Sequence, residues 1–358
     1  MKTDNKSKRI TSIDALRALT LLGILLVHTK SGFGYSYLGD SYMIDKLANG
    51  FINLFLVHKC NIIFSVLFGI SFFLILRNPN NTSGKFVWRC FLLMLIGLFN
   101  KFYYTYDALM WYGFWGMCLV SIRNLRDKSI FVVFVLLTIL TAILRTFDLG
   151  DTLFAEHDIK RYVIGKSFSD LLLYPYSIFD YLRVVFNAGI FVTLSYFVLG
   201  YWLARVGIIE KLDTVVTKKV VILFWIGYIF SFVLKLGIGS THILRLINNY
   251  SASFTYSATL IYLYYHVGFM HSFLRRFEAY GKLGLTNYSM MGIWGVVMMS
   301  DFGLSLCTHN LFYALCFFLL FYVFQLFFSS VWLKYYRYGP LEYMWRVATE
   351  RKLISMKR

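Results

Sequence analysis

Three ionisable side chains in the first apolar stretch of the chain could take part in chemistry. Asp14, Arg17 and His28 interrupt residues 13–28, which are otherwise almost wholly apolar. In a helix with about 3.6 residues per turn, these three positions fall on one face, and a rise of about 1.5 Å per residue separates Arg17 from His28 by about 16 Å. Histidine titrates near neutral pH and can take a proton from a hydroxyl group, and arginine can bind or polarise an oxygen.

Two interpretations of this stretch remain open on sequence alone. An ionisable group inside a membrane span costs about 3 kcal/mol on insertion scales, which favours a functional site. Alternatively, Arg17 extends to the membrane interface and pairs with Asp14, and His28 only hydrogen-bonds a neighbouring helix.

The composition indicates an integral membrane protein. The chain has 358 residues, of which 58% are hydrophobic, 20% aromatic and only 15% charged, and its mean hydropathy is +0.62. The net charge of +18 could suggest nucleic acid, but the basic residues gather in short loops on one side of the predicted spans, so we expect no nucleic-acid partner. None of the five cysteines forms a CxxC pair, so no metal site or disulfide framework is expected.

The predicted fold is an all-α polytopic bundle of about ten transmembrane helices with both termini in the cytoplasm. The bias of Lys and Arg toward alternate loops sets this orientation. Residues 42–58 are amphipathic and predict an interfacial helix before the second span. The predicted spans are 13–30, 60–76, 87–104, 108–122, 129–146, 184–204, 219–237, 253–271, 284–302 and 309–333.

We expect one transmembrane domain over 1–358, with N-terminal helices in 1–140 and a C-terminal region in 184–358. The connection 146–183 is long and rich in acidic residues. It is predicted to lie outside the cytoplasm, where it either caps a cleft or is a solvated surface loop.

Several motifs resemble the YeiB-like family of bacterial membrane proteins (DUF418). The family closes on a G-P-L-E-aromatic-x-W-R tail, and GPLEYMWR stands at 339–346. Shorter matches are IDALRA at 13–18, Lys59 with FSVLFG at 64–69, and Asp107 with the Tyr112 that follows it. The resemblance covers both ends of the chain and the first four predicted spans, and it implies a bacterial cytoplasmic (inner) membrane location.

Two positions depart from the family pattern. The family usually carries Asn where His28 stands, and often His where Asn100 stands. The resulting Arg17-x10-His28 spacing looks like the R-x10-H pattern of integral-membrane acyltransferases, the acyltransferase 3 proteins that O-acetylate envelope sugars. The YeiB-like family is thought to share a superfamily with those proteins and with heparan-glucosaminide acetyltransferase-like proteins.

The resemblance implies acyl transfer from cytoplasmic acyl-CoA to an envelope glycan or lipid-linked sugar, and we assign roles on that basis. His28 would be the base, with Asp107 as the next catalytic candidate, and Arg17, held by Asp14, would bind the donor. The remaining candidates are Arg275, Arg276, Thr286 and Asn287 for the donor, and Asn100, Trp111 and Tyr112 on the acceptor side.

Each of these assignments has a structural alternative. Arg275 and Arg276 fit ordinary positive charge on the inner side, Asp107 could pair with Lys101, and Thr286 could cap a helix. In the tail, Gly339-Pro340 should end the last span, and Glu342 is expected to pair with an arginine of an inner loop.

Two other functions remain possible for such a chain: a small-molecule transporter, or a non-catalytic membrane component of the envelope. No clear internal repeat supports a transporter. Transfer of label from acetyl-CoA in membrane fractions would separate an enzyme from both alternatives. We expect membrane lipid as a partner, while the acceptor, the acyl chain and the oligomeric state stay undetermined by the sequence.

Overall fold

Helices make up every described element of this chain except one isolated bridge between Tyr336 and Lys357. The computed structural model describes residues 10–34, 42–78, 81–101, 104, 107–147, 188–239, 241–300, 303–306 and 310–358. The helices are α1 (Thr11–Lys30), α2 (Met43–Phe51), α3 (Lys59–Leu76), α4 (Ser83–Lys101), α5 (Leu109–Cys118), α6 (Asp127–Thr146), α10 (Ala188–Arg205), α11 (Leu212–Val215), α12 (Lys218–Ile238), α13 (His242–His266), α14 (Gly268–Leu274), α15 (Glu278–Lys282), α16 (Gly284–Met299), α17 (Leu311–Tyr335) and α18 (Pro340–Glu350). Shorter helical turns are η1 (Gly32–Gly34), the π-helix η2 (Ile52–Leu56), η3 (Ile208–Lys211) and η4 (Arg275–Phe277). The expectation of an all-α protein is confirmed for the described residues.

The long helices have the length and apolarity of membrane spans. Among the described residues, six stretches could cross a membrane: α1, the run Met43–Leu76, α4, α6, α12 and α17. A seventh arises if the pair Phe191–Arg205 and Ile208–Val215, bent by 63°, forms one span. The chain is therefore a multi-pass membrane protein. The other predicted spans fall on α5, α10, α13 and α16.

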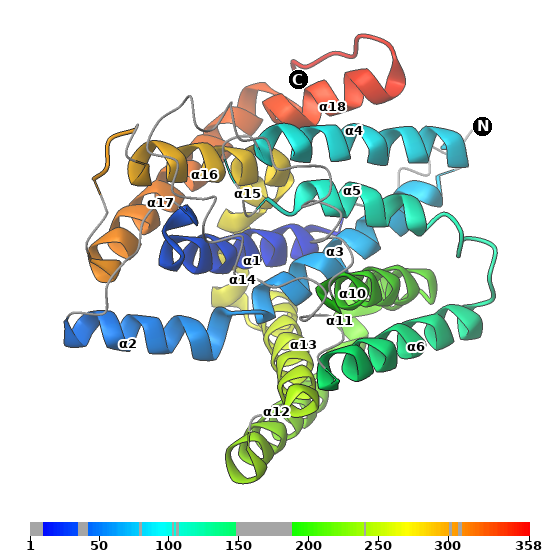
Figure 1. The fold of residues 1–358 in the computed structure, drawn as a ribbon. Coiled ribbons are helices and arrows are strands. Elements are labelled where there is room, and N and C mark those ends of the chain that lie inside the picture. The colour runs from blue at the N-terminus through cyan, green and yellow to red at the C-terminus, as the bar shows by residue number, and fades with distance from the viewer. Residues whose placement is uncertain are drawn as a thin grey trace.

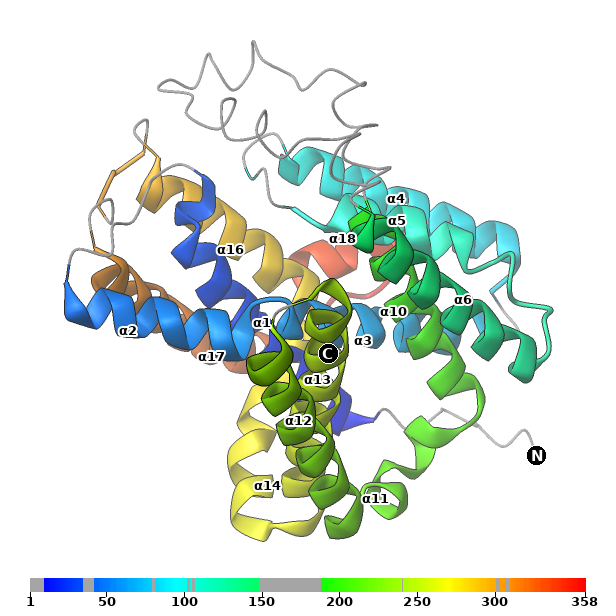
Figure 2. The same cartoon turned by 60° about the horizontal axis from the view of Figure 1, so that its bottom comes forward.

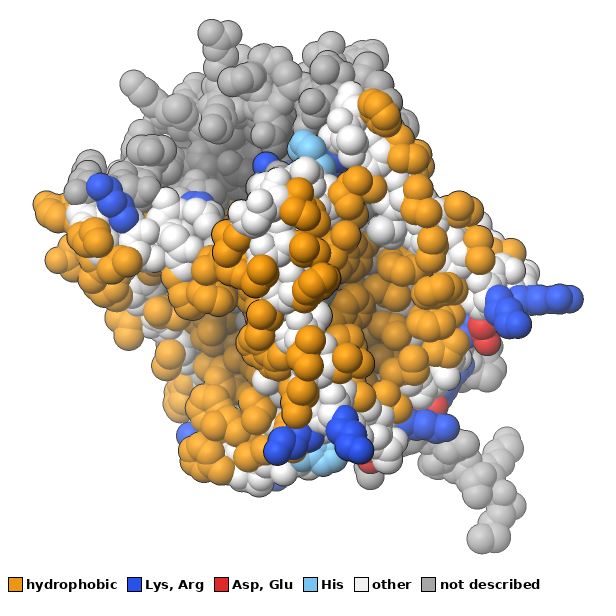
Figure 3. All heavy atoms as spheres, turned by 90° about the horizontal axis from the view of Figure 1, so that it is seen from below, with side chains coloured by type: hydrophobic (Ala, Val, Ile, Leu, Met, Phe, Trp, Pro, Cys, Tyr) orange, Lys and Arg blue, Asp and Glu red, His pale blue; other side chains and the backbone are white. Residues whose placement is uncertain are grey.

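The surface of the bundle agrees with a lipid environment. Only 17% of the apolar window of α12 is buried, against 61% for α1. Side chains such as Leu223, Phe230 and Leu236 on α12 are exposed. Hydrophobic side chains cover the middle of the face in Figure 3, and Lys and Arg lie along its lower margin. An apolar band between charged margins is the pattern expected when lipid is the solvent.

Helix α1 lies at the centre of the bundle. It contacts α3, α13, α15, α16 and α17, and Figure 1 shows it enclosed by them. Figure 2 shows three groups around α1 and α3: α2, α16 and α17 on one side, α4, α5, α6 and α10 on the other, and α12 to α14 below. A helix that is buried on all sides needs small or apolar residues on every face, and Ala18, Leu21 and Leu25 are fully buried.

Two glycines allow α3 and α10 to pack with their backbones in direct contact. A Cβ atom added at Gly69 would lie 2.1 Å from the Phe197 carbonyl oxygen, and one added at Gly200 would lie 2.0 Å from the Val66 carbonyl oxygen. Small residues at such crossings let membrane helices approach closely, where dispersion contacts replace the hydrophobic effect as the source of stability.

The amphipathic segment before the second span is helical, as predicted, and is divided between α2 and η2. The buried Asp45 carboxylate holds α2 in place. It accepts from the Tyr42 backbone N–H at 3.4 Å and from the Phe312 N–H, at the start of α17, at 2.9 Å. One carboxylate therefore satisfies N–H groups at the beginnings of two helices, groups that have no partner within a helix.

Helix α13 begins at His242, eleven residues before the span that the sequence predicts over 253–271. The difference arises because its polar residues bond within the bundle. Asn248 donates to Ser231 Oγ at 3.1 Å, and Ser231 and Ser251 share a hydrogen bond of 2.8 Å. These contacts with α12 satisfy polar groups that would otherwise disfavour a membrane helix.

Arg17 joins three helices near the N-terminal end of α1. Its guanidinium donates to Asp14 Oδ1 at 2.9 Å, to the Gly281 carbonyl of α15 at 3.1 Å and to Ser71 Oγ of α3 at 3.1 Å. The predicted Asp14–Arg17 pair is confirmed, and the Asp14 side chain is only 4% exposed. Arg17 is thus directed into the helix junction and does not extend alone to the interface.

The tail folds back onto the bundle. Helix α17 ends at Tyr335, and α18 begins at Pro340 with Gly339 as its N-cap, so the predicted break at Gly339-Pro340 is confirmed. The Trp345 indole N–H donates to the Arg89 carbonyl of α4 at 2.9 Å, and the Arg89 guanidinium lies 4.1 Å from the centre of the Trp345 ring.

Glu342 pairs with no arginine in the described part of the chain, so that expectation is wrong. Its Oε1 accepts from the Leu285 and Thr286 backbone N–H groups at 2.8 and 3.0 Å, and its Oε2 accepts from the Thr286 hydroxyl at 2.5 Å. The carboxylate therefore caps the N-terminus of α16, where unpaired N–H groups and the helix dipole favour negative charge. Burial raises the pKa of Glu342, and these hydrogen bonds offset part of that shift.

The Arg17 junction can be tested by substitution. Arg17→Ala should lower the free energy of unfolding by about 3 kcal/mol, because it removes the partner of a buried carboxylate. Arg77→Ala is the control, since its ion pair with Glu210 is exposed on both sides and should be worth about 1 kcal/mol or less. Chemical denaturation of the two variants in detergent measures the difference, and equal losses would refute the junction.

The cap of α16 can be tested in the same way. Glu342→Ala should destabilise the protein by about 2 kcal/mol, because two backbone N–H groups lose their acceptor, whereas Glu342→Gln keeps one acceptor oxygen and should lose less. Glu350→Ala on the same helix removes only the ion pair with Lys85 and is the control. If Glu342→Ala melts like Glu350→Ala, Glu342 is not a stabilising cap.

Candidate functional site

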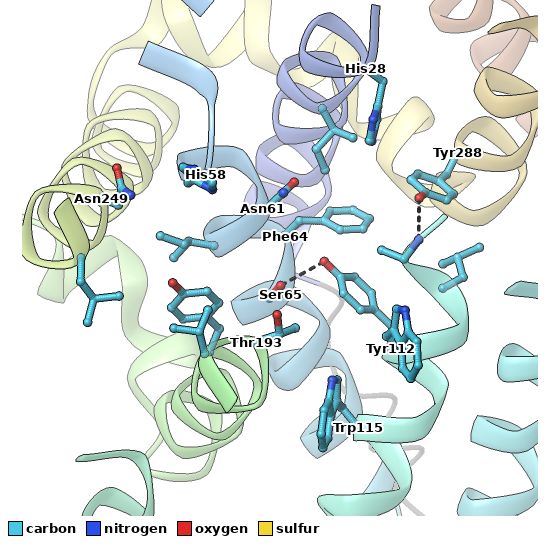
Figure 4. A pocket seen from close by; sticks show the side chains of 18 of the residues that line it. His28, His58, Asn61, Phe64, Ser65, Tyr112, Trp115, Thr193, Asn249 and Tyr288 are labelled. Atoms are coloured by element: carbon cyan, nitrogen blue, oxygen red, sulfur yellow. Dashed lines mark hydrogen bonds between the residues drawn. The ribbon is translucent and has the colours of Figure 1, made fainter. Parts of the chain in front are cut away.

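A cavity of about 360 Å³ lies beside the C-terminal half of α1. Its wall is formed by residues of seven helices and by residues that directly precede two of them. The lining residues are Ile24, His28, His58, Asn61, Ile62, Phe64, Ser65, Ala108, Leu109, Trp111, Tyr112, Trp115, Arg145, Val192, Thr193, Tyr196, Leu246, Asn249 and Tyr288. Figure 4 shows polar and aromatic side chains from these helices directed into one space. Such a concave site, largely apolar with a few convergent polar groups, is typical of small-molecule binding.

His28 reaches this cavity from α1. Its ring meets the Tyr104 ring edge-on, with 5.3 Å between centroids, and lies 6.1 Å from the Phe33 ring. These aromatic neighbours fix the plane of the imidazole. The sequence-predicted base therefore lies at a cavity and not only at a contact between helices, so it has room for a ligand beside it.

The aromatic wall is held by hydrogen bonds at the start of α5. The Tyr112 hydroxyl shares a 3.0 Å hydrogen bond with Ser65 Oγ of α3, and the Tyr288 hydroxyl accepts from the Ala108 backbone N–H at 3.1 Å. Trp111 and Trp115 line the same wall. Two of the predicted acceptor-side residues, Trp111 and Tyr112, thus share the cavity with His28.

Asp107 and Asn100 form a buried pair next to the cavity, outside its lining. Asn100 donates to Asp107 Oδ2 at 3.0 Å and to Ser289 Oγ at 3.1 Å, and Asp107 Oδ1 accepts from the Leu109 N–H at 2.8 Å. Burial raises the pKa of Asp107, in the connection between α4 and α5, and the hydrogen bonds lower it in part. This carboxylate positions the first turn of α5, which carries Trp111 and Tyr112.

The predicted donor-binding residues lie toward the other end of α1. Thr286 is bonded to Glu342, as described above. Asn287 donates to the Tyr280 carbonyl at 3.1 Å and to Ser329 Oγ at 3.0 Å. Arg275 and Arg276 are exposed on η4, which contacts α1. The candidate residues therefore form two groups. One group lines the cavity or, like Asp107 and Asn100, lies next to it, and the other lies toward the Arg17 junction.

Sequence reasoning missed several residues of the cavity. His58, Asn61 and Asn249 line it without belonging to any motif that stood out. His58 directly precedes Lys59 and has a φ of 67°, which a non-glycine residue rarely adopts. In the sequence, only the polarity of His58 and Asn61 at the start of an apolar span could have indicated that these two residues belong to a site.

Among the described lining residues, the ionisable side chains are all basic or neutral. Arg145, His28 and His58 line the cavity, and no described Asp or Glu does. Among the residues that the structure describes, no group of three or more His, Cys, Asp and Glu side chains is arranged to hold a metal ion.

Comparison with known proteins gives a family match. The chain is 27% identical to the uncharacterized protein YxaH of Bacillus subtilis (strain 168), and 24% identical to an uncharacterized 39.9 kDa protein in the amylase 3'region of Bacillus acidopullulyticus. Each match covers 96% of this chain and 94% of the relative. No solved structure matches the chain. Residues 203–352 match the family described as "Protein of unknown function (DUF418)". That segment includes the GPLEYMWR tail and the capped start of α16, so the C-terminal part of the chain is similar to the DUF418 family.

Proposed function

We propose that this protein is an acyl-CoA-dependent membrane acyltransferase that modifies a hydroxyl group of an envelope glycan or lipid-linked sugar. The observation that carries the proposal is the position of His28 at an aromatic and amide-lined cavity of about 360 Å³. Indole and phenol rings stack on the apolar faces of sugars, while amide and hydroxyl groups bond their hydroxyls. Trp111, Trp115 and Asn249 supply both kinds of contact.

In the reaction, His28 acts on the acceptor. Its imidazole takes the proton from the acceptor hydroxyl as the oxygen attacks the thioester carbonyl. The carbon–sulfur bond then breaks, and the imidazolium returns the proton to the departing sulfur, so CoA leaves as the thiol. Histidine suits this role because its ordinary pKa is close to the working pH. Trp111 and Tyr112 orient the acceptor, and Asp107 positions them through α5.

The donor would approach from the opposite end of α1. The exposed guanidinium groups of Arg275 and Arg276 are suited to the phosphates of acyl-CoA. Arg17 contributes chiefly by holding the junction of α1, α3 and α15, since its guanidinium is already bonded to all three. The Thr286 and Asn287 side chains support the donor end in a similar way, through the start of α16.

The orientation that serves this reaction has ten crossings of a bacterial cytoplasmic membrane with both termini inside. It requires α5, α10, α13 and α16 to cross in addition to the six long apolar stretches. The basic residues of the segments that join the helices support this orientation. The Arg17 junction then faces the cytoplasm, where acyl-CoA is made, and His28 faces the envelope.

The role of His28 is tested with membrane vesicles and acetyl-CoA labelled in its acetyl group. His28→Ala and His28→Asn should each lower transfer of label to envelope acceptors by about 100-fold or more, because neither side chain is a base at neutral pH. His242→Ala, at the exposed start of α13, is the matched control and should transfer normally. Full activity in His28→Asn would show that the base is another group.

The orientation is tested by fusing a reporter that is active only outside the cytoplasm. Fusions after residues 126, 210 and 280 should be inactive, and a fusion at residue 240, between α12 and α13, should be active. The charge bias and the ten crossings both lead to this pattern. A single reversed fusion would require a different number of crossings.

A further inference from the structure

Basic side chains gather around His58 and Arg145, a part of the cavity lining that we call the rim. His58 is an exposed lining residue, and Arg145 in the last turn of α6 also lines the cavity. Arg145, Lys59 and Arg245 are the charged groups close enough to His58 to affect it electrostatically. These residues come from α3, α6 and α13, so three separate helices bring basic side chains to one rim.

The described part of the chain provides little to balance this charge. No hydrogen bond or ion pair there involves the side chain of Arg145 or of His58, and no described carboxylate lines the cavity. By contrast, Arg17 and Arg205 each have a carboxylate partner within 2.9 Å. An arginine held at a cavity without an acidic partner is suited to an anion from outside the protein.

The other lining residues indicate what the rest of such an anionic ligand would contain. Asn61 and Asn249 add amide groups to the lining, and Trp111 and Trp115 add indole rings. Figure 4 shows His58 and Asn249 on one side of the space and His28 and Tyr288 on the other. A ligand that fills it has an anionic end at Arg145 and His58 and a hydroxylated, ring-like body between the rim and His28.

We propose that the cavity binds a phosphate-bearing ligand whose phosphate lies against Arg145 and His58. Phosphate fits better than a single carboxylate because its oxygens can accept from the arginine fork and from an imidazole N–H at the same time. The phosphate can belong to a membrane lipid or to a soluble sugar phosphate. This inference rests on the proposed function only where it identifies the ligand as the acyl acceptor, since binding of the ligand needs no acyl donor.

Binding is measured with the full-length protein in nanodiscs of zwitterionic lipid, by the tryptophan fluorescence of the cavity wall. Glucose 1-phosphate is titrated with glucose as the neutral control. A second arm compares retention of phosphatidylglycerol and phosphatidylcholine by native mass spectrometry. Preference for the anionic compound in the first arm supports a soluble ligand, and in the second arm a lipid. No preference in either arm overturns the proposal.

Substitutions then locate the phosphate. Arg145→Gln should weaken binding of the anionic compound about tenfold or more and leave the neutral control unchanged, while Arg145→Lys should retain part of the affinity. Lys128→Gln, at the other end of α6, removes the same charge and should bind as the wild type does. His58→Gln tests the site from α3, so the experiment does not depend on the folding of one variant. Wild-type affinity in both Arg145→Gln and His58→Gln overturns the assignment.

The two proposals can fail separately. If label transfer is absent while Arg145-dependent phosphate binding is present, the acyltransferase function is wrong and the binding site remains. If transfer depends on His28 while phosphate binding is absent, the acceptor is not phosphorylated and this inference is wrong.

Discussion

This structure depends on one constraint. Polar groups inside a lipid-facing bundle must find hydrogen-bond partners within the protein. Arg17 illustrates it best, because one guanidinium satisfies the Asp14 carboxylate, the Gly281 carbonyl and the Ser71 hydroxyl. In lipid, an unpaired group at any of these positions has no water to bond. The same requirement explains why Asp45 and Glu342 each accept from backbone N–H groups at the start of a neighbouring helix.

These bonds also determine where the site lies. With its N-terminal end held by α3 and α15, α1 presents the other end, which carries His28, to the space between α3, α5 and α16. The buried Asp107 then fixes the first turn of α5, and Tyr288 bonds the same turn. The same hydrogen bonds pack the helices together and position the cavity wall, and a site for an oriented ligand needs such positioning.

The match of the C-terminal part to the DUF418 family relates these features to a group of proteins but does not supply an activity. The matched region, 203–352, contains the cap of α16 and the tail that rests on α4. His28, His58 and Arg145 all lie outside it. The described structure therefore divides into a C-terminal part with the family motif and an N-terminal part that provides most of the cavity.

Much of the local structure follows from the sequence alone. The apolar runs predict the membrane helices, the amphipathic segment predicts α2, the proline after Gly339 predicts the end of α17, and the spacing of Asp14 and Arg17 predicts their pair. These features depend on residues close together in the chain, where helix geometry and backbone sterics decide the outcome. Ten crossings and the site roles remain predictions, and the connection 146–183 lies outside the described residues beyond residue 147.

Only the tertiary structure decided which distant residues meet. His58, Arg145 and Asn249 share the cavity with His28 because of how α3, α6 and α13 pack, and no local pattern records that packing. Charge alone predicts an ion pair between Glu342 and an arginine, whereas the fold brings the Glu342 carboxylate to the N–H groups of α16. Helix α13 begins before its apolar run because α12 supplies hydrogen-bond partners for its polar residues. Helix periodicity determines the face on which a side chain lies, but close packing between helices determines what that face meets.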